Sequence, residues 1–211
     1  MSLIWLNGPF GGGKTQTAYE LHRRLAGSVV CDPEHAGFGL RRMLPPGLRA
    51  DFQDLTSWRT GVVEVLDLTL RSYEGAVIAP MTVTEPKYFE ETVGRLRDLG
   101  HEVHHFALLA RRETVLKRLK ERDLVHTLKS AVGLGPNDGG ETWARRQLDT
   151  CLNRLRDKQF ASHVWTDDLT VPEVADQVAA EAGLSLTENS DSRLTGQVRR
   201  AWTGIKHIRL D

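Results

Sequence analysis

Cysteine is scarce in this chain of 211 residues, which contains only Cys31 and Cys151. The two cysteines lie far apart and form no Cys-x-x-Cys pair, which argues against a disulfide framework and against a zinc site. His101, His104 and His105 lack an acid or a cysteine at metal-ligand spacing, so we interpret these histidines as structural. This cysteine usage fits a protein of the reducing cytoplasm.

Excess charge and long apolar runs are missing as well. The 28 Lys and Arg residues balance 28 Asp and Glu residues, which gives no global reason to expect nucleic acid as a partner. No apolar run approaches the ~18 residues that a membrane-spanning helix needs. The first residues carry no basic leader, so we expect no signal peptide and a cytoplasmic protein.

The strongest motif is the glycine-rich segment Gly-Pro-Phe-Gly-Gly-Gly-Lys-Thr at 8–15. It matches the pattern of Gly, four residues, Gly-Lys-Ser/Thr, and lies between an apolar run at 3–7 and an amphipathic segment at 18–25. Glycines let the backbone curl until successive N–H groups point at an anion. We predict that Lys14 reaches the terminal phosphates of a nucleotide and that Thr15 holds Mg²⁺. The predicted nucleotide-binding residues are Gly8, Pro9, Phe10, Gly11, Gly12, Gly13, Lys14 and Thr15.

Apolar runs and helical periodicities alternate along the rest of the chain. Further strands are expected at 28–32, 76–79, 103–109 and 163–166, and helices at 58–73, 84–99, 113–122, 143–160 and 171–182. Residues 37–49 are expected to form a loop with a helical turn at 40–44, and 123–141 a glycine-rich gap. The alternation predicts one α/β domain at 1–183, a five-stranded parallel sheet with helices on both faces. Its ligands should bind beyond the carboxyl ends of the strands.

Candidate catalytic and substrate residues follow the second and third strands. Asp32 is suited to accept a proton from a substrate hydroxyl or to bind Mg²⁺ through water, and the alternative is a carboxylate that caps the turn before Pro33. Glu34 lies two residues further on and is suited to share this catalytic role with Asp32. The other predicted substrate residues are Arg41, Arg42, Pro80, Met81 and Thr82.

Arginines on either side of the glycine-rich gap predict a mobile lid at about 118–146. Arg118 and Arg122 precede the gap, and arginines of a closing lid neutralise a migrating phosphoryl group while excluding water. The alternative is an ordinary solvated helix face.

Taken together, these motifs resemble the P-loop nucleotide and small-molecule kinases over residues 1–183. More narrowly, 4–15, 32–34 and 78–82 resemble the tunicamycin-resistance proteins, an ATP-binding bacterial group. The resemblance implies MgATP as the nucleotide and tunicamycin, a uridine-containing nucleoside antibiotic, as the second ligand. One departure is that the third strand ends in Ala-Pro where many P-loop ATPases place an Asp, so Mg²⁺ support must come from Asp32 or from water.

Three functions share these features. The preferred hypothesis is ATP-dependent phosphorylation of tunicamycin or a related nucleoside compound, with Lys14, Asp32, Arg118 and Arg122 as the catalytic residues. The alternatives are ATP-dependent sequestration of the drug without turnover, and a housekeeping nucleotide kinase. All three use the same phosphate site.

The C-terminal tail at 184–211 is predicted to be basic and amphipathic. Its apolar residues at helical spacing are Leu194, Val198, Trp202, Ile205 and Ile208. One interpretation is a helix on the inner surface of the membrane. The other is a terminal element that docks on the domain or on the second subunit of a homodimer.

Overall fold

The computed structural model describes residues 1–131 and 140–189, and for 122–131 and 140–146 the backbone alone. Five strands form one parallel sheet in the order β2-β3-β1-β4-β5, which confirms the predicted sheet. The strands are β1 Ser2–Asn7, β2 Val29–Val30, β3 Val77–Pro80, β4 Glu102–Leu109 and β5 His163–Trp165. Because β1 is central, the loop that follows it lies at the middle of the carboxyl edge.

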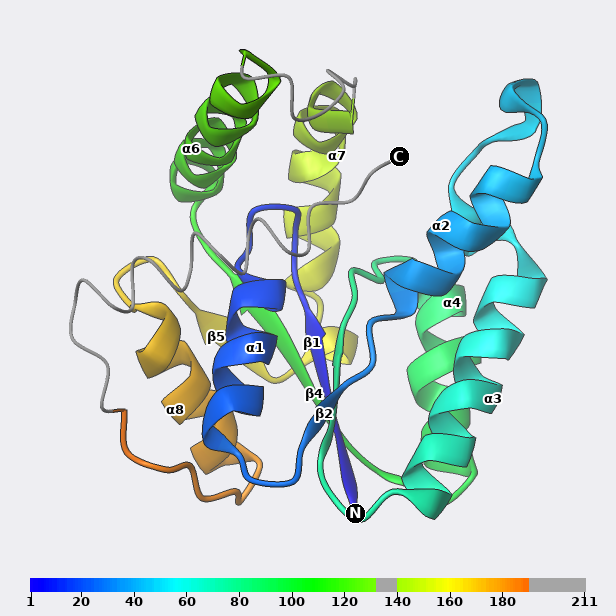
Figure 1. Cartoon of the computed structure of the whole chain (residues 1–211), viewed down its shortest axis with the longest axis vertical. Coiled ribbons are helices and arrows are strands. Elements are labelled where there is room, and N and C mark those ends of the chain that lie inside the picture. Colours follow the sequence, from blue (N-terminus) through cyan, green and yellow to red (C-terminus); the bar gives the residue numbers. More distant parts are fainter. Residues whose placement is uncertain (132–139, 190–211) are drawn as a thin grey trace.

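Helices cover both faces of the sheet, as predicted (Figure 1). On one face, α1 (Lys14–Arg24) and α8 (Val171–Glu181) pack against Ile4 and Leu6 of β1. On the other, α3 (Thr56–Ser72) and the helical stretch that precedes β4 pack against Leu3 and Trp5. Successive residues of β1 are apolar because both faces of the strand are buried.

The segment after β2 differs from the prediction. It forms helix α2 (Pro33–Met43), so the loop predicted at 37–39 is wrong, whereas the helical turn predicted at 40–44 lies almost wholly within α2. Asp32 is the N-cap of α2, and Pro33 occupies the first helical position, where its missing N–H costs nothing. Two 3₁₀ turns follow, η1 (Pro46–Leu48) and η2 (Phe52–Asp54).

The helix expected at 84–99 also differs from the prediction, because it is not a single regular helix. It consists of α4 (Pro86–Phe89), a π-helical turn η3 (Glu90–Gly94) and α5 (Arg95–Asp98). Its N-cap is Glu85, so Thr84, the first residue of the expected helix, lies outside it.

The lid region begins with a longer helix than expected. Helix α6 runs over Arg112–Ala131 and extends into the predicted gap. Helix α7 runs over Gly140–Leu155, so the helix expected at 143–160 begins and ends earlier than predicted. The 3₁₀ turn η4 (Lys158–Phe160) follows it. An apolar cluster joins α6 and α7, and such tertiary packing stabilises a helix whose own periodicity is weak. The cluster contains Ala110, Val115, Leu119, Leu148 and Leu152. Residues 132–139, the centre of the predicted lid, lie outside the described residues.

The C-terminal side of the domain extends past the predicted boundary at 183. Leu184 and Leu186 pack against the cluster that contains α1 and α8, and the Thr187 N–H donates to the Arg24 carbonyl oxygen at 2.9 Å. The predictions for 190–211 concern residues outside the described part of the chain. Among the described helices, none is long and apolar enough to cross a bilayer.

Candidate active site

The glycine-rich loop connects the end of β1 to the first turn of α1, and two of its positions require glycine. A Cβ added to Gly8 would lie 2.8 Å from the carbonyl oxygen of Leu108. Gly13, the N-cap of α1, has a φ of +91°, which side chains disfavour. The curl that an anion-binding loop needs is therefore built into the backbone.

Lys14 lies inside this loop, with 7% of its surface exposed. Its Nζ donates to the carbonyl oxygens of Gly8 at 3.0 Å and Pro9 at 3.1 Å, and lies 5.5 Å from the centre of the Phe10 ring. Thr15 follows in the same helical turn and is partly exposed. The loop therefore surrounds a positive charge beside the N-terminus of a helix, an arrangement that attracts anions.

Two polar side chains attach this loop to the segment after β3. Thr82 Oγ1 donates to the Gly8 carbonyl oxygen at 2.7 Å. Asn7 Oδ1 accepts from the N–H groups of Gly8 at 2.9 Å and Val83 at 3.0 Å, and Asn7 Nδ2 donates to the Val83 carbonyl oxygen at 2.7 Å. Asn7 was not among the predicted residues. A polar residue at the end of an otherwise apolar strand is the signal that could have identified it.

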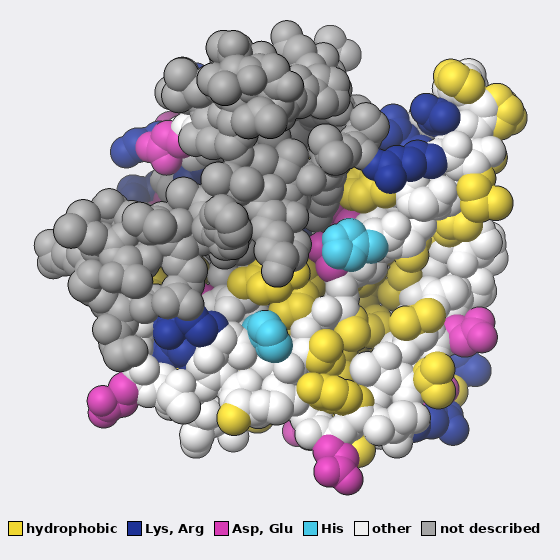
Figure 2. Space-filling model, in the orientation of Figure 1, with side chains coloured by type: hydrophobic (Ala, Val, Ile, Leu, Met, Phe, Trp, Pro, Cys, Tyr) yellow, Lys and Arg dark blue, Asp and Glu magenta, His cyan; other side chains and the backbone are white. Residues whose placement is uncertain are grey.

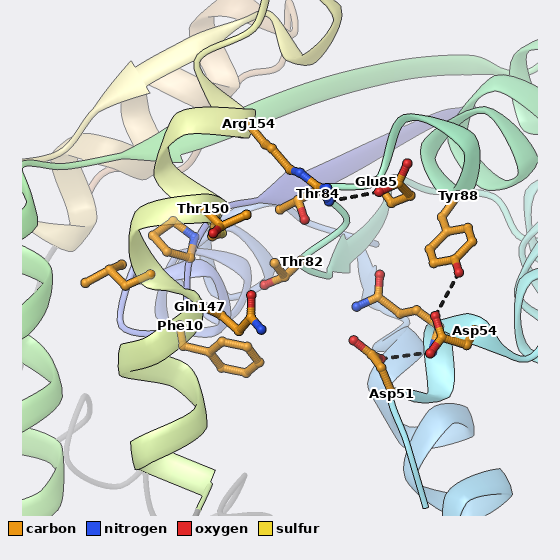
Figure 3. Close-up of a pocket in the computed structure, with 14 residues that line it drawn as sticks. Phe10, Asp51, Asp54, Thr82, Thr84, Glu85, Tyr88, Gln147, Thr150 and Arg154 are labelled. Atoms are coloured by element: carbon orange, nitrogen blue, oxygen red, sulfur yellow. Dashed lines mark hydrogen bonds and ion pairs between the residues drawn. The ribbon is translucent and has the colours of Figure 1, made fainter.

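A pocket of about 330 Å³ opens beside the loop. Asp51 and Asp54 lie on the opposite side of it from Phe10 and Gln147 (Figure 3). Its lining residues are Pro9, Phe10, Asp51, Gln53, Asp54, Thr82, Thr84, Glu85, Tyr88, Gln147, Leu148, Thr150, Cys151 and Arg154. The pocket therefore joins the glycine-rich loop to η2, the segment after β3, and α7.

Hydrogen bonds and burial organise the polar groups of this pocket. The Tyr88 hydroxyl donates to Asp54 Oδ1 at 2.7 Å, and this bond raises the pKa of Tyr88 above its usual value. Asp51 caps η2 by accepting from the Gln53 N–H at 3.0 Å. Burial, with a smaller contribution from Asp54, raises the pKa of Asp51 although the Gln53 bond opposes the shift.

Comparison with known proteins identifies the family. A family model described as an AAA domain matches residues 3–133. The structure of the Deinococcus radiodurans tunicamycin resistance protein is 33% identical in sequence, with a TM-score of 0.71, and the match covers 90% of this chain and 100% of that one. The chain belongs to the tunicamycin resistance protein family.

Kinases of lower sequence identity share the fold with this family member. The Mycobacterium tuberculosis APS kinase, solved with AMPPNP and APS, is 16% identical over 86% of this chain and 97% of its own, with a TM-score of 0.57. The shikimate kinase of Bacteroides thetaiotaomicron is 15% identical over 87% and 99%, with a TM-score of 0.55. These likenesses show a P-loop kinase-like fold. Curated protein sequences include no match to the chain.

In this member of the tunicamycin resistance protein family, the predicted substrate residues form two groups, one at the end of β3 and one on α2. Thr82 lines the pocket, whereas Pro80 ends β3 and Met81 is 1% exposed in the core. The second group is carried by α2 and is not part of the pocket lining. It consists of Glu34, which is 2% exposed, and of Arg41 and Arg42 in the last turn. Basic side chains gather over this region of the surface (Figure 2).

Asp32 and Arg118 also have structural partners. The Asp32 carboxylate accepts from the Glu34 N–H at 3.0 Å, which is the capping role considered as its alternative. Arg118 donates to the Thr166 hydroxyl at 3.0 Å and to the Thr166 carbonyl oxygen at 2.7 Å, and burial lowers its pKa. The side chain of Arg122 lies outside the described residues.

Sequence reasoning missed most of the pocket. Asp51, Asp54, Tyr88 and Arg154 were not predicted, because their segments are far apart in the sequence and carry no shared motif. The one local signal was the pair of acids at 51 and 54, immediately before a strongly periodic helix.

Proposed function

We propose that the protein transfers the terminal phosphoryl group of MgATP to a hydroxyl group of tunicamycin or of a related nucleoside compound. One observation carries this proposal. Pro9 and Phe10 belong to the phosphate loop and also line the pocket of about 330 Å³. A nucleotide held by the loop would therefore present its terminal phosphate to a second ligand in that pocket. The name of the 33%-identical relative supports tunicamycin as that ligand.

Lys14 and Thr15 are proposed to have different roles toward the nucleotide. Lys14 would neutralise charge on the migrating phosphoryl group, since its ammonium already lies against the Gly8 and Pro9 carbonyl oxygens. Thr15 fits a role in holding Mg²⁺, because its hydroxyl follows in the first turn of α1 and is partly exposed. Bound Mg²⁺ supplies charge neutralisation for the phosphates. No carboxylate directly follows Ala79 and Pro80 at the end of β3, so Asp32 or water remains the proposed support for Mg²⁺.

The acceptor side needs an oriented hydroxyl group. In the proposed step, the acceptor oxygen forms a bond to the terminal phosphorus, the bond from that phosphorus to the ADP oxygen breaks, and the hydroxyl proton passes to a carboxylate. Asp32 is the proposed proton acceptor. Arg118 and Arg122 are proposed to close over the nucleotide, with Arg118 anchored on Thr166 at the carboxyl end of β5.

Sequestration of the drug without turnover is the second candidate. The observation in its favour is that Asp32 caps α2 and is not part of the pocket lining. If Asp32, the proposed proton acceptor, does not reach the acceptor hydroxyl, the protein would bind the nucleotide and the drug without transferring the phosphoryl group.

Incubation with ATP and tunicamycin, followed by mass spectrometry of the drug, separates the two candidates. We expect a phosphorylated drug from the wild-type protein and none from Lys14→Ala. Lys158→Ala is the control, because this exposed lysine lies in η4, next to the amino end of β5. An unmodified drug in the presence of nucleotide-bound protein overturns the phosphotransfer proposal and leaves sequestration.

The segment 190–211 is the proposed contact with the inner membrane surface or with a second subunit. Truncation after Asn189 tests this, because it retains the contacts of Thr187 with Arg24. Loss of binding to anionic vesicles supports the membrane surface, and loss of a dimer in sedimentation supports the second subunit.

A further inference from the structure

Acidic side chains outnumber basic ones among the described residues that line the pocket. Among the described lining residues, Asp51, Asp54 and Glu85 are acidic and Arg154 is basic. Arg154 Nη1 lies 2.8 Å from Glu85 Oε2, so these two charges compensate each other (Figure 3). Asp51 and Asp54 have no basic partner among the described lining residues, so the lining carries a net negative charge.

Nearby cations are already engaged. Arg59 is 5% exposed, lies 4.4 Å from the centre of the Tyr88 ring, and pairs with Glu91 while donating to the Gln53 carbonyl oxygen. The Arg59 guanidinium therefore packs against the lining residues Tyr88 and Gln53 but does not itself line the pocket. Arg41 acts on Asp51 from the last turn of α2, but it is not part of the lining.

The remaining polar groups of the pocket suit neutral hydrogen bonding. Its lining includes the amides of Gln53 and Gln147 and the hydroxyls of Thr82, Thr84 and Thr150. Carboxylates accept hydrogen bonds from hydroxyl groups, whereas a phosphate, which is acceptor-rich and negative, would be repelled by them. A site for an anionic acceptor would instead be favoured by basic side chains, and arginines in particular bind phosphate through bidentate pairs.

We infer that this pocket selects an uncharged, hydroxyl-rich ligand and rejects a phosphorylated one, with Asp51 and Asp54 as the residues that determine this specificity. The inference rests on the proposed function for the use of the pocket as the acceptor site. It favours a nucleoside or sugar as the acceptor over a nucleoside monophosphate. It therefore argues against a housekeeping kinase that acts on monophosphates.

Direct binding to the full chain tests the inference. Calorimetry in the presence of a nonhydrolysable ATP analogue compares uridine with uridine 5′-monophosphate, which differ in the charged group, and includes tunicamycin. We expect uridine and tunicamycin to bind at least about tenfold more tightly than the monophosphate. Asp51→Asn and Asp54→Asn each keep a capping or accepting oxygen, and each should reduce this discrimination about tenfold.

Asp98→Asn is the matched control, because this exposed carboxylate ends α5 at the amino edge of the sheet. It should leave the ratio of affinities unchanged. Equal or tighter binding of the monophosphate, or no binding of any probe, overturns the inference, as does unchanged discrimination in both pocket variants. Binding is measured apart from turnover, so discrimination without phosphorylated product would refute the kinase proposal and leave the inference standing.

Discussion

Thr82 and Lys14 donate to the same acceptor, the Gly8 carbonyl oxygen, at 2.7 Å and 3.0 Å. Thr82 lines the pocket, and Lys14 lies inside the phosphate loop. One backbone oxygen therefore connects the proposed acceptor site to the proposed phosphate site.

Removing the Thr82 hydroxyl should loosen this connection. Thr82→Val keeps the shape of the side chain and loses the bond to Gly8, so we expect nucleotide affinity to fall about tenfold and the unfolding free energy by about 1 kcal/mol. Calorimetry with an ATP analogue and urea unfolding measure the two effects. Thr60→Val, on the exposed surface of α3, serves as the control. Unchanged nucleotide affinity in Thr82→Val would show that the shared carbonyl has no role in binding.

Asn7 should be more important for stability than for ligand contact. Its side chain is fully buried and bonds Gly8 and Val83, so Asn7→Leu would leave their backbone groups without partners. We expect the unfolding free energy to fall by about 3 kcal/mol in urea titrations. A variant with wild-type stability would contradict the hydrogen-bond network described for this side chain.

Asp32 has two proposed roles that different substitutions separate. Asparagine is as good an N-cap as aspartate, so Asp32→Asn should retain stability while turnover of tunicamycin falls by at least about 100-fold. Asp32→Ala should also lose about 1 kcal/mol of stability, measured by urea unfolding. Full turnover in Asp32→Asn would show that this carboxylate only caps α2.

His105 should make the domain sensitive to acid. Its Nε2 lies 3.2 Å from Asn7 Nδ2 and its Nδ1 lies 3.2 Å from the Ala161 carbonyl oxygen, contacts that suit a neutral ring protonated at Nδ1. Burial lowers the pKa of His105 from 6.5 to about 4. The folded-state pKa lies below the unfolded one, so this contribution to stability is present above pH 6.5 and is lost as the pH falls toward 4.

The loss would amount to about 3 kcal/mol for a shift of this size. Urea unfolding at several pH values should therefore show a smaller acid dependence for His105→Gln than for the wild-type protein. His104→Gln, whose ring bonds the exposed Glu102, should retain the wild-type dependence. Identical acid dependence in His105→Gln and the wild-type protein would refute the assignment.

Particular segments show why sequence reasoning succeeded in some places and failed in others. The start of α2 was not predicted, because Pro33 was not recognised as the first residue of a helix, although a proline after an N-cap often begins one. The end predicted for α6 at 122 was wrong, because the helix continues to Ala131 although its sequence after 122 shows little helical periodicity.

The sequence by itself determined the glycine-rich loop between a strand and a helix, the order of strands and helices along the chain, and the family. These features are local, since a glycine-rich turn or a buried strand is specified by consecutive residues and their spacing. Only the tertiary structure decided the pocket proposed as the acceptor site, because Phe10, Asp51, Tyr88 and Arg154 come from four separate segments that the fold brings together. Local sequence therefore specifies the glycine-rich loop, whereas the packing of α7 and η2 beside it forms the pocket.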